Sequence, residues 1–319
     1  MNAQTHPLPS VVRIVAESPM VSVIIPVLND AERLQLCLHA LMQQTYRRDR
    51  YEVIVVDNDS EDKLAIAQVV SQFEAIRLVV ELTPGSYAAR NRGIALARGE
   101  VLAFTDADCI PASDWLEQGV GVLLATPNCG LVAGKIDLFF QDVHHPTPIE
   151  LYESVTAFPQ ATLLAQEKGG ATANVLTWRA LFEQVGLFDP MLRSRGDLEW
   201  GQRVFAAGYQ QVYAEAAIVQ HPARDSLTQL YRRTTRLAGG QYSLQTKTAV
   251  SWLDRNLVFS RMLLQNLVPP LLFVWATFRD RRLSGLRQKL AVSLVMFFVR
   301  YVTAWELLRL KLGGTPERA

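Results

Sequence analysis

Cysteine is scarce in this chain, and its spacing excludes a disulfide framework. The 319 residues contain three cysteines, Cys37, Cys109 and Cys129, which are odd in number and widely separated. This pattern is typical of reduced thiols in the cytosol. Cys109 is a weak candidate for a nucleophile, because no histidine stands near it in the sequence to activate the thiol.

The sequence also lacks a large excess of charge and a leader pattern. Its formal net charge is +1, which gives no reason to expect a nucleic-acid partner. Residues 1–20 are polar and contain proline, and no basic stretch followed by an apolar core occurs among them. We therefore expect no secretory signal there and interpret residues 1–20 as a loose N-terminal lead-in.

Short apolar runs alternate with helical patterns between residue 21 and about residue 132. The runs predict strands at 21–27, 51–56, 76–80 and 101–104. The segments between them predict helices, which we place at 31–44, 61–73 and 86–97. This alternation favours βαβ units, and hence an α/β fold with a mostly parallel sheet flanked by helices.

Carboxylates follow two of the predicted strands. Asp57 comes directly after the strand at 51–56, and Asp106 and Asp108 follow the strand at 101–104. Ligands of open α/β sheets bind at the carboxyl ends of the strands. Asp106 and Asp108 occupy alternate positions, so their side chains point to one side of an extended segment. Such a pair suits a hard divalent cation that shares its oxygen ligands with substrate phosphates.

The pattern is weaker between residues 133 and 222. It predicts short helices at 178–185 and 197–207, and two short strands at 209–213 and 217–220. The small residues at 168–174 would allow the backbone to approach a ligand closely.

The last third of the chain has a different, helical composition. The segment 262–278 is apolar but is interrupted by two prolines, and 290–308 is apolar but contains Arg300 and Glu306. A spanning helix needs about 20 apolar residues with few charges. We therefore expect partly amphipathic helices that lie in the membrane interface, or a shallow hairpin. The alternative is that these helices pack on the rest of the chain or on a second subunit.

Basic residues flank these apolar segments, which would suit the anionic lipid of a cytoplasmic membrane face. They are Arg279, Arg281, Arg282, Arg287, Lys289, Arg309 and Lys311.

Six motifs, taken in order, resemble the family 2 glycosyltransferases of the inverting GT-A type. They are Val21-Ser22-Val23-Ile24-Ile25-Pro26 with Asn29, Val55-Val56-Asp57-Asn58-Asp59-Ser60, Gly85-Ser86-Tyr87-Ala88-Ala89-Arg90-Asn91-Arg92-Gly93, Thr105-Asp106-Ala107-Asp108, Arg195-Gly196-Asp197-Leu198-Glu199 and His221-Pro222. Each motif alone is weak evidence for this family, but six of them in the family's order are a specific signal. The resemblance covers 21–222 and implies a GT-A catalytic domain there, with a nucleotide-binding half at 21–132 and an acceptor half at 133–222. The helical, membrane-associated region then occupies 223–319.

The resemblance implies a nucleotide-sugar donor, a divalent cation (Mn²⁺ or Mg²⁺) and inversion at the anomeric carbon. It implies that Asp57 and Asn58 lie at the nucleobase. Many members have a second Asp where this chain has Asn58, so the base stays open between UDP, the expected one, and GDP or dTDP. The resemblance also implies donor contacts for Pro26, Asn29, Arg90 and Asp106. Asn174, at the end of the small-residue stretch 168–174, is a further candidate for contact with the donor sugar or the acceptor.

The same resemblance assigns the metal ligands and the catalytic base, and the residue types beside the base suggest an acceptor pocket. Asp108 would bind the metal, and His221 falls where some members place a further metal ligand; a structural histidine before a turn is the alternative. Asp197 would be the catalytic base, and a helix N-cap is a compatible second role. Glu199 and Trp200 are candidates for the acceptor pocket, although a core position suits Trp200 equally well.

Processive members of the family carry a Gln-x-x-Arg-Trp signature. The nearest run here is Gln229-Leu230-Tyr231-Arg232-Arg233, with Arg in place of Trp, which favours transfer of one sugar per binding event. We therefore expect a non-processive glycosyltransferase at the cytoplasmic membrane face that acts on a glycan or lipid-linked acceptor, as in exopolysaccharide or cell-envelope glycan synthesis.

Two alternatives come from other functional classes. A sugar-phosphate nucleotidylyltransferase would need a glycine-rich signature with Arg and Lys after the first strand, where Pro26-Val27-Leu28-Asn29 stands instead. A non-catalytic binding or assembly protein with the same fold would have no need of Asp108 and Asp197 together.

Overall fold

The computed structural model describes residues 18–247 and 250–315; most of the predicted lead-in at 1–20 lies outside them. The described residues form one eight-stranded sheet in the order β3-β2-β1-β4-β7-β6-β8-β5. Its strands are β1 (Val21–Val27), β2 (Tyr51–Asp57), β3 (Ile76–Val80), β4 (Val101–Phe104), β5 (Ile110–Pro111), β6 (Cys129–Phe139), β7 (Val175–Trp178) and β8 (Gln210–Pro222).

The first half of the sheet is parallel, as predicted. Strand β1 pairs in parallel with β2 and β4, and β2 pairs in parallel with β3. All residues of β2 and β4 are buried, which explains why these strands appear as continuous apolar runs in the sequence. The bounds predicted for β1, β3 and β4 are confirmed.

The second half of the sheet is mixed. Strand β7 runs antiparallel to β4 and β6, β5 runs antiparallel to β8, and β6 runs parallel to β8. The prediction of two short strands at 209–213 and 217–220 is wrong, because β8 is continuous. A register shift against β6 between Gly134 and Lys135 interrupts its pattern instead.

Helices cover both faces of the sheet. One core joins the sheet to α1, α2 and α4, and a second core on the other face joins it to α3, α7 and α8. The helices of this part are α1 (Ala31–Met42), α2 (Lys63–Ser71), α3 (Ser86–Leu96), α4 (Trp115–Ala125), α5 (Pro148–Thr156), α6 (Gln160–Thr162), α7 (Arg179–Val185) and α8 (Gly196–Ala206), with short turns η1 (Arg48–Arg50), η2 (Leu163–Glu167) and η3 (Thr172–Asn174).

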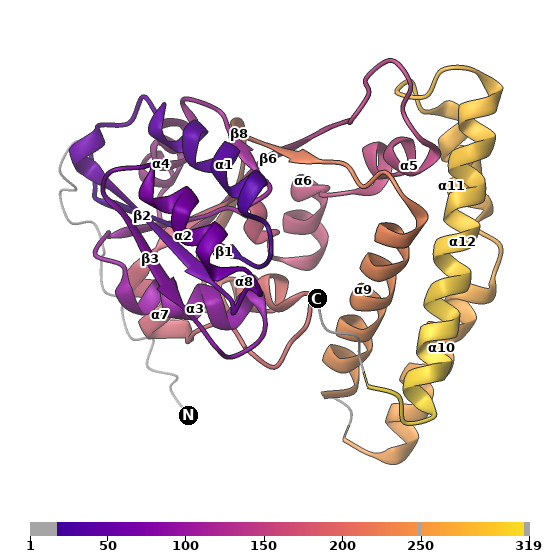
Figure 1. The fold of residues 1–319 in the computed structure, drawn as a ribbon. Helices are drawn as coiled ribbons and strands as arrows, with labels where there is room; N and C mark the ends of the chain where they lie inside the picture. The colour runs from indigo at the N-terminus through magenta and orange to yellow at the C-terminus, as the bar shows by residue number, and fades with distance from the viewer. Residues whose placement is uncertain (1–17, 248–249, 316–319) are drawn as a thin grey trace.

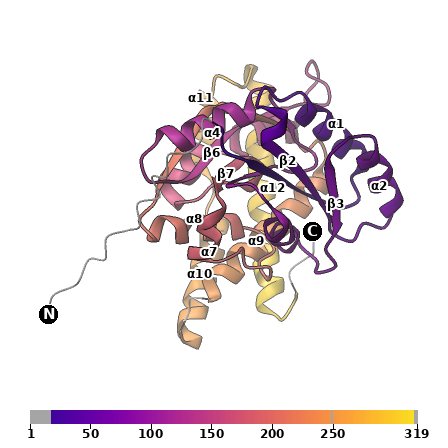
Figure 2. The ribbon, with the colours of Figure 1, turned by 90° about the vertical axis from the view of Figure 1, so that its left-hand side faces the viewer.

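The C-terminal region is helical, as expected, and stands beside the sheet (Figure 1). It comprises α9 (Leu227–Lys247), α10 (Trp252–Leu267), α11 (Leu271–Arg279) and α12 (Gly285–Lys311). Helix α12 packs against α5, α9, α10 and α11, and a third core lies between α5, α9 and α12. In the turned view, the lower ends of α10 and α12 extend below the sheet (Figure 2).

One side of α12 stays uncovered. Large apolar side chains are exposed along it at intervals of three or four residues: Leu290, Leu294, Phe297, Tyr301, Trp305, Leu308 and Leu312. Its two internal charged residues, Arg300 and Glu306, both have partners within the protein. Glu306 forms an ion pair with Arg309, and Arg300 donates hydrogen bonds to a backbone carbonyl of α10 and to that of the residue after α10. By length and composition α12 is apolar enough to cross a membrane, and α10 with α11 forms a second such segment bent by 46°.

Candidate functional site

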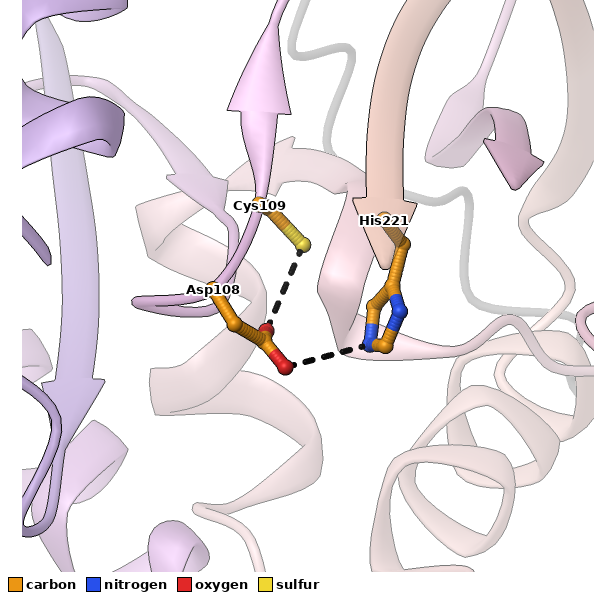
Figure 3. A group of neighbouring side chains, drawn as sticks. All are labelled: Asp108, Cys109 and His221. Carbon is orange, nitrogen blue, oxygen red and sulfur yellow. Dashed lines mark hydrogen bonds and ion pairs between the residues drawn. The ribbon is translucent and has the colours of Figure 1, made fainter. Parts of the chain in front are cut away.

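Asp108 and His221 meet at the edge of the sheet, although they are 113 positions apart in the sequence. Asp108 follows β4, and His221 is the penultimate residue of β8. The carboxylate Oδ2 of Asp108 lies 3.6 Å from Nε2 of His221 (Figure 3). With the thiol of Cys109, these side chains offer metal-ligating atoms within 4.8 Å of one another.

The imidazole of His221 is oriented by the backbone. Its Nδ1 lies 2.7 Å from the carbonyl oxygen of Pro222; this oxygen can only accept a hydrogen bond, so Nδ1 donates it. Nε2 faces the carboxylate of Asp108. Backbone carbonyls often orient metal-ligating histidines in this way. A carboxylate and a neutral imidazole nitrogen are suitable ligands for Mn²⁺, and the carboxylate also suits Mg²⁺.

Cys109 is unsuited to nucleophilic catalysis. Its side chain is fully buried, and burial, together with the negative charges of Asp106 and Asp108, raises the pKa of its thiol well above the ordinary value. The thiolate is the reactive form of cysteine, so the structure supports the interpretation against a Cys109 nucleophile.

A chain of contacts links the acidic strand end to Asp197. Arg90 on α3 is buried and forms an ion pair of 2.5 Å with Asp106. Its guanidinium also lies 5.7 Å from the ring centroid of Tyr87, one turn earlier on the same helix. The hydroxyl of Tyr87 donates to Oδ1 of Asp197 at 3.1 Å. Asp106, Arg90, Tyr87 and Asp197 therefore form one connected group.

Asp197 lies in the first turn of α8, where the backbone holds its carboxylate. Oδ1 accepts the N–H of Leu198 at 3.0 Å, and Oδ2 accepts the N–H of Thr172 at 3.2 Å. The predicted N-cap role is wrong, because Arg195 occupies the cap position and α8 already begins at Gly196. The carboxylate still lies at the positive end of the helix, where anions are favoured.

The residues assigned to the nucleobase and donor lie at the carboxyl ends of β1 and β2. Asp57 is buried, and its Oδ1 accepts the N–H of Ser60. The side chain of Asn58 donates to two backbone carbonyls of the next loop and accepts the N–H of Gly85 at 2.7 Å. Gly85 has φ +124°, a backbone conformation that favours glycine. Asn58 therefore fixes the loop that starts α3.

Asn29 and Pro26 are at the same edge. Oδ1 of Asn29 accepts the N–H of Glu61 at 2.8 Å, so this side chain joins the loops that follow β1 and β2. Pro26 is the penultimate residue of β1 and pairs in register with Val56.

Two of the predicted site residues are buried in the protein interior. Asn174 is fully buried; it donates to two backbone carbonyls and accepts from the indole N–H of Trp115. Trp200 is 1% exposed and stacks on Phe182 with ring centroids 4.4 Å apart. The predicted ligand contacts of Asn174 and Trp200 are therefore corrected to structural roles, because neither side chain has a surface left for a sugar.

Glu199 is also engaged by the protein. Its carboxylate pairs with Arg203 one turn later on α8, at 3.0 Å. The carboxylate stays partly exposed, and the acceptor contact of Glu199 stays a prediction.

Sequence reasoning missed Tyr87 and a cleft rich in arginine. The sequence could have indicated a site position for Tyr87, since Tyr87 lies three residues before Arg90 and therefore on the same face of the helix. The cleft has a volume of about 1070 Å³ and extends from Asp108 and His221 to arginines of α1, of the loop after β8 and of α9. Its parts are about 200 residues apart in the sequence, so no local signal could have predicted it.

Comparison with known proteins now identifies the family. The model of glycosyl transferase family 2 matches residues 22–186. The chain belongs to this family. It is therefore a transferase, and the membership of family 2 that the motifs suggested is confirmed.

Named relatives of this family 2 glycosyltransferase agree with the assignment. Glycosyltransferase AglE of Haloferax volcanii is 38% identical over 226 residues, which are 70% of this chain and 73% of AglE. The amylovoran biosynthesis glycosyltransferase AmsB of Erwinia amylovora is 38% identical over 107 residues, which are 32% of this chain and 35% of AmsB.

A solved structure confirms the fold class. The mannosyltransferase PcManGT from Pyrobaculum calidifontis, determined with GDP-Man and Mn²⁺, superimposes with a TM-score of 0.60. The match covers 92% of this chain and 89% of PcManGT at 19% identity, and it therefore shows the GT-A fold alone.

Proposed function

We propose that this family 2 glycosyltransferase moves one sugar, with inversion, from a nucleotide-sugar to a glycan or lipid-linked acceptor in a metal-dependent reaction. The observation that carries the proposal is the connected group of Asp106, Arg90, Tyr87 and Asp197 next to the Asp108–His221 pair. A carboxylate–imidazole pair for a cation and a separate carboxylate for a proton are what such a transfer needs.

Asp108 and His221 would hold the divalent cation, Mn²⁺ or Mg²⁺. When bound, the cation would neutralise negative charge on the leaving diphosphate. Arg90 supports a donor site beside them, because its Nε is buried and has no hydrogen-bond partner among the described residues. A buried, unpaired N–H is costly, and an oxygen of the donor would satisfy it.

Asp197 would act as the general base. Inversion requires a group that removes the proton of the acceptor hydroxyl as this hydroxyl attacks the anomeric carbon from the face opposite the leaving group. Contacts from Tyr87, Leu198 and Thr172 hold the Asp197 carboxylate in one orientation. Such preorientation favours catalysis, since the base needs no rearrangement before it accepts the proton.

Transfer of a single sugar is supported by Arg233, which replaces the tryptophan of the processive signature. The Arg233 guanidinium lies 3.6 Å from the buried carboxylate of Glu153 on α5. A charged, paired side chain offers no free flat apolar surface on which a growing sugar chain could slide. UDP is the expected nucleotide, and GDP is included in the test because PcManGT was determined with GDP-Man.

We place the enzyme at the cytoplasmic face of a membrane. The exposed apolar residues of α12 recur at helical spacing, and further ones lie on α10 and α11, such as Leu257, Leu264, Leu271 and Trp275. An exposed apolar surface of this extent is typical of a membrane or partner contact. The basic side chains around it suit anionic headgroups, and a lipid-linked acceptor would be presented at that surface.

Donor hydrolysis without acceptor tests the proposed function. We expect the wild type to release the nucleoside diphosphate slowly from one of UDP-, GDP- or dTDP-hexoses, only with Mn²⁺ or Mg²⁺. Asp108→Ala removes a metal ligand and should abolish this release, whereas Asp49→Ala, an exposed carboxylate outside the site, should retain it. Metal-independent release, or release unaffected by Asp108→Ala, would contradict the proposal. Formation of inorganic diphosphate from a nucleoside triphosphate and a sugar phosphate would indicate a nucleotidylyltransferase instead, and no turnover at all a binding protein.

A further inference from the structure

The arginine cleft holds more positive charge than the donor can neutralise. Its arginines are Arg33, Arg224, Arg232, Arg233 and Arg236, and its acidic lining residues are Asp108 and Asp225. Beneath the cleft, the buried Glu153 pairs with Arg224 at 3.0 Å and approaches Arg233 at 3.6 Å. Arg33 also pairs with Asp30 at 3.1 Å, so five cations face four carboxylates and leave a net of one positive charge.

Binding of the donor leaves this excess in place. A nucleotide-sugar carries about two negative charges on its diphosphate, and the divalent cation at Asp108 and His221 brings two positive ones. The two contributions cancel. The cleft therefore retains its net positive charge in the donor complex and attracts a second anion, such as a phosphate group.

The geometry of the cluster agrees with this charge count. Within the described part of the chain, neither Arg232 nor Arg236 forms an ion pair with a carboxylate. Burial, followed by the charge of Arg224, lowers the pKa of Arg233 and of Arg236. Guanidinium groups nonetheless stay charged in proteins, so these groups are cations crowded together without sufficient counter-charge.

Helix α9 brings the cluster beside the proposed reaction centre. It lies so close to the loop before Asp197 that a side chain on Gly240 would collide with Ser194. The hydroxyl of Ser194 also donates a hydrogen bond to the backbone carbonyl of Arg236. The negative charges of Asp106 and Asp197 act on Arg236 and favour its charged form. The contact between Ser194 and Arg236 therefore brings the cluster to the loop that leads to Asp197, the proposed base for the acceptor hydroxyl.

We propose that the arginine cleft binds a phosphate group carried by the acceptor, so that the acceptor is a phosphate- or diphosphate-linked molecule rather than a neutral glycan. This inference rests on the proposed function and names the acceptor class. Arg232 and Arg236 contact the phosphate, since guanidinium groups bind phosphate oxygens in pairs of hydrogen bonds. Arg224 and Arg233, held by Glu153, form the wall behind it.

Isothermal titration of the full-length protein with simple phosphates tests the inference. The donor site is first filled with Mn²⁺ and a mixture of UDP, GDP and dTDP. The probes are inorganic phosphate, citronellyl phosphate and, as the uncharged control, citronellol. We expect both phosphates to bind and citronellol to show no binding; tighter binding of citronellyl phosphate identifies a lipid-linked acceptor, and equal binding a soluble phosphorylated one.

Matched variants locate the phosphate. Arg232→Gln/Arg236→Gln should weaken binding at least tenfold, and Arg232→Gln alone, at an exposed position, several-fold. The control Arg255→Gln/Arg261→Gln removes two exposed charges from α10 and should bind like the wild type. Absent phosphate binding or equal loss in the control would overturn the inference. Phosphate binding that occurs only when the nucleotides are left out would also overturn it, because the arginines would then belong to the donor site. Failure of the proposed function would show separately, as missing donor hydrolysis by the wild type.

Discussion

Replacing Asp197 by asparagine tests the assignment of the general base with little disturbance of the fold. The asparagine Oδ1 can still accept from Tyr87 and Leu198, as Oδ1 of Asp197 does at 3.1 and 3.0 Å. Only the N–H of Thr172, 3.2 Å from Oδ2, then faces an amide group, and one lost bond costs about 1–3 kcal/mol of stability. Loss of general-base catalysis lowers turnover about 10²–10⁴-fold, or about 3–5 kcal/mol in activation free energy.

The assay separates turnover from binding. We expect Asp197→Asn to bind the nucleotide-sugar with Mn²⁺ within twofold of the wild type, while kcat for transfer falls at least a hundredfold. Glu183→Gln, which removes an exposed carboxylate from the neighbouring α7, should leave both values unchanged. If Asp197→Asn retained more than a tenth of the wild-type kcat, or lost donor affinity in proportion to kcat, Asp197 would not be the base.

Two further predictions concern the core and the membrane. Trp200→Ala should reduce the free energy of unfolding by about 3–5 kcal/mol in urea denaturation, because Trp200 is buried against Phe182; a loss below 1 kcal/mol with weakened acceptor binding would return Trp200 to the acceptor pocket. Leu294→Asp/Tyr301→Asp, at side chains 69% and 73% exposed, should lower flotation with anionic vesicles at least tenfold, since burial of each side chain contributes about 2 kcal/mol. Leu64→Asp, also exposed, is the control, and equal flotation of all three proteins would contradict membrane contact through α12.

The parallel half of the fold was predictable because its strands are buried on both faces. Short continuous apolar runs such as 21–27 and 101–104 predict buried strands of a parallel sheet when segments with a helical pattern lie between them. The antiparallel half was not predictable in this detail. Strand β6 was not predicted. Strand β8 was predicted as two strands, because the bulge in its pairing with β6 and its partly exposed residues interrupt the apolar pattern.

The site was predictable where the chemistry follows a strand end, and not where it depends on distant packing. Asp106 and Asp108 lie at the sheet edge that the strand pattern predicted, and His221, which was assigned through the family resemblance, lies beside Asp108. Asn174 and Trp200 were assigned by residue type and by their neighbours in the sequence, and neither criterion indicates whether a side chain is buried in the core. The bond between Tyr87 and Asp197 joins residues 110 positions apart, and no local pattern encodes such a contact.

A thermal-shift screen against UDP-, GDP- and dTDP-sugars, each with and without Mn²⁺, tests the central claim of a metal-dependent donor site most directly. A ligand at a hundred times its Kd stabilises the native state by about 2.7 kcal/mol, which corresponds to about 5–10 °C in Tm for a domain of this size. We predict such a shift for one nucleotide, only with the metal and not in Asp108→Ala. No metal-dependent shift with any of the three nucleotides would contradict the account.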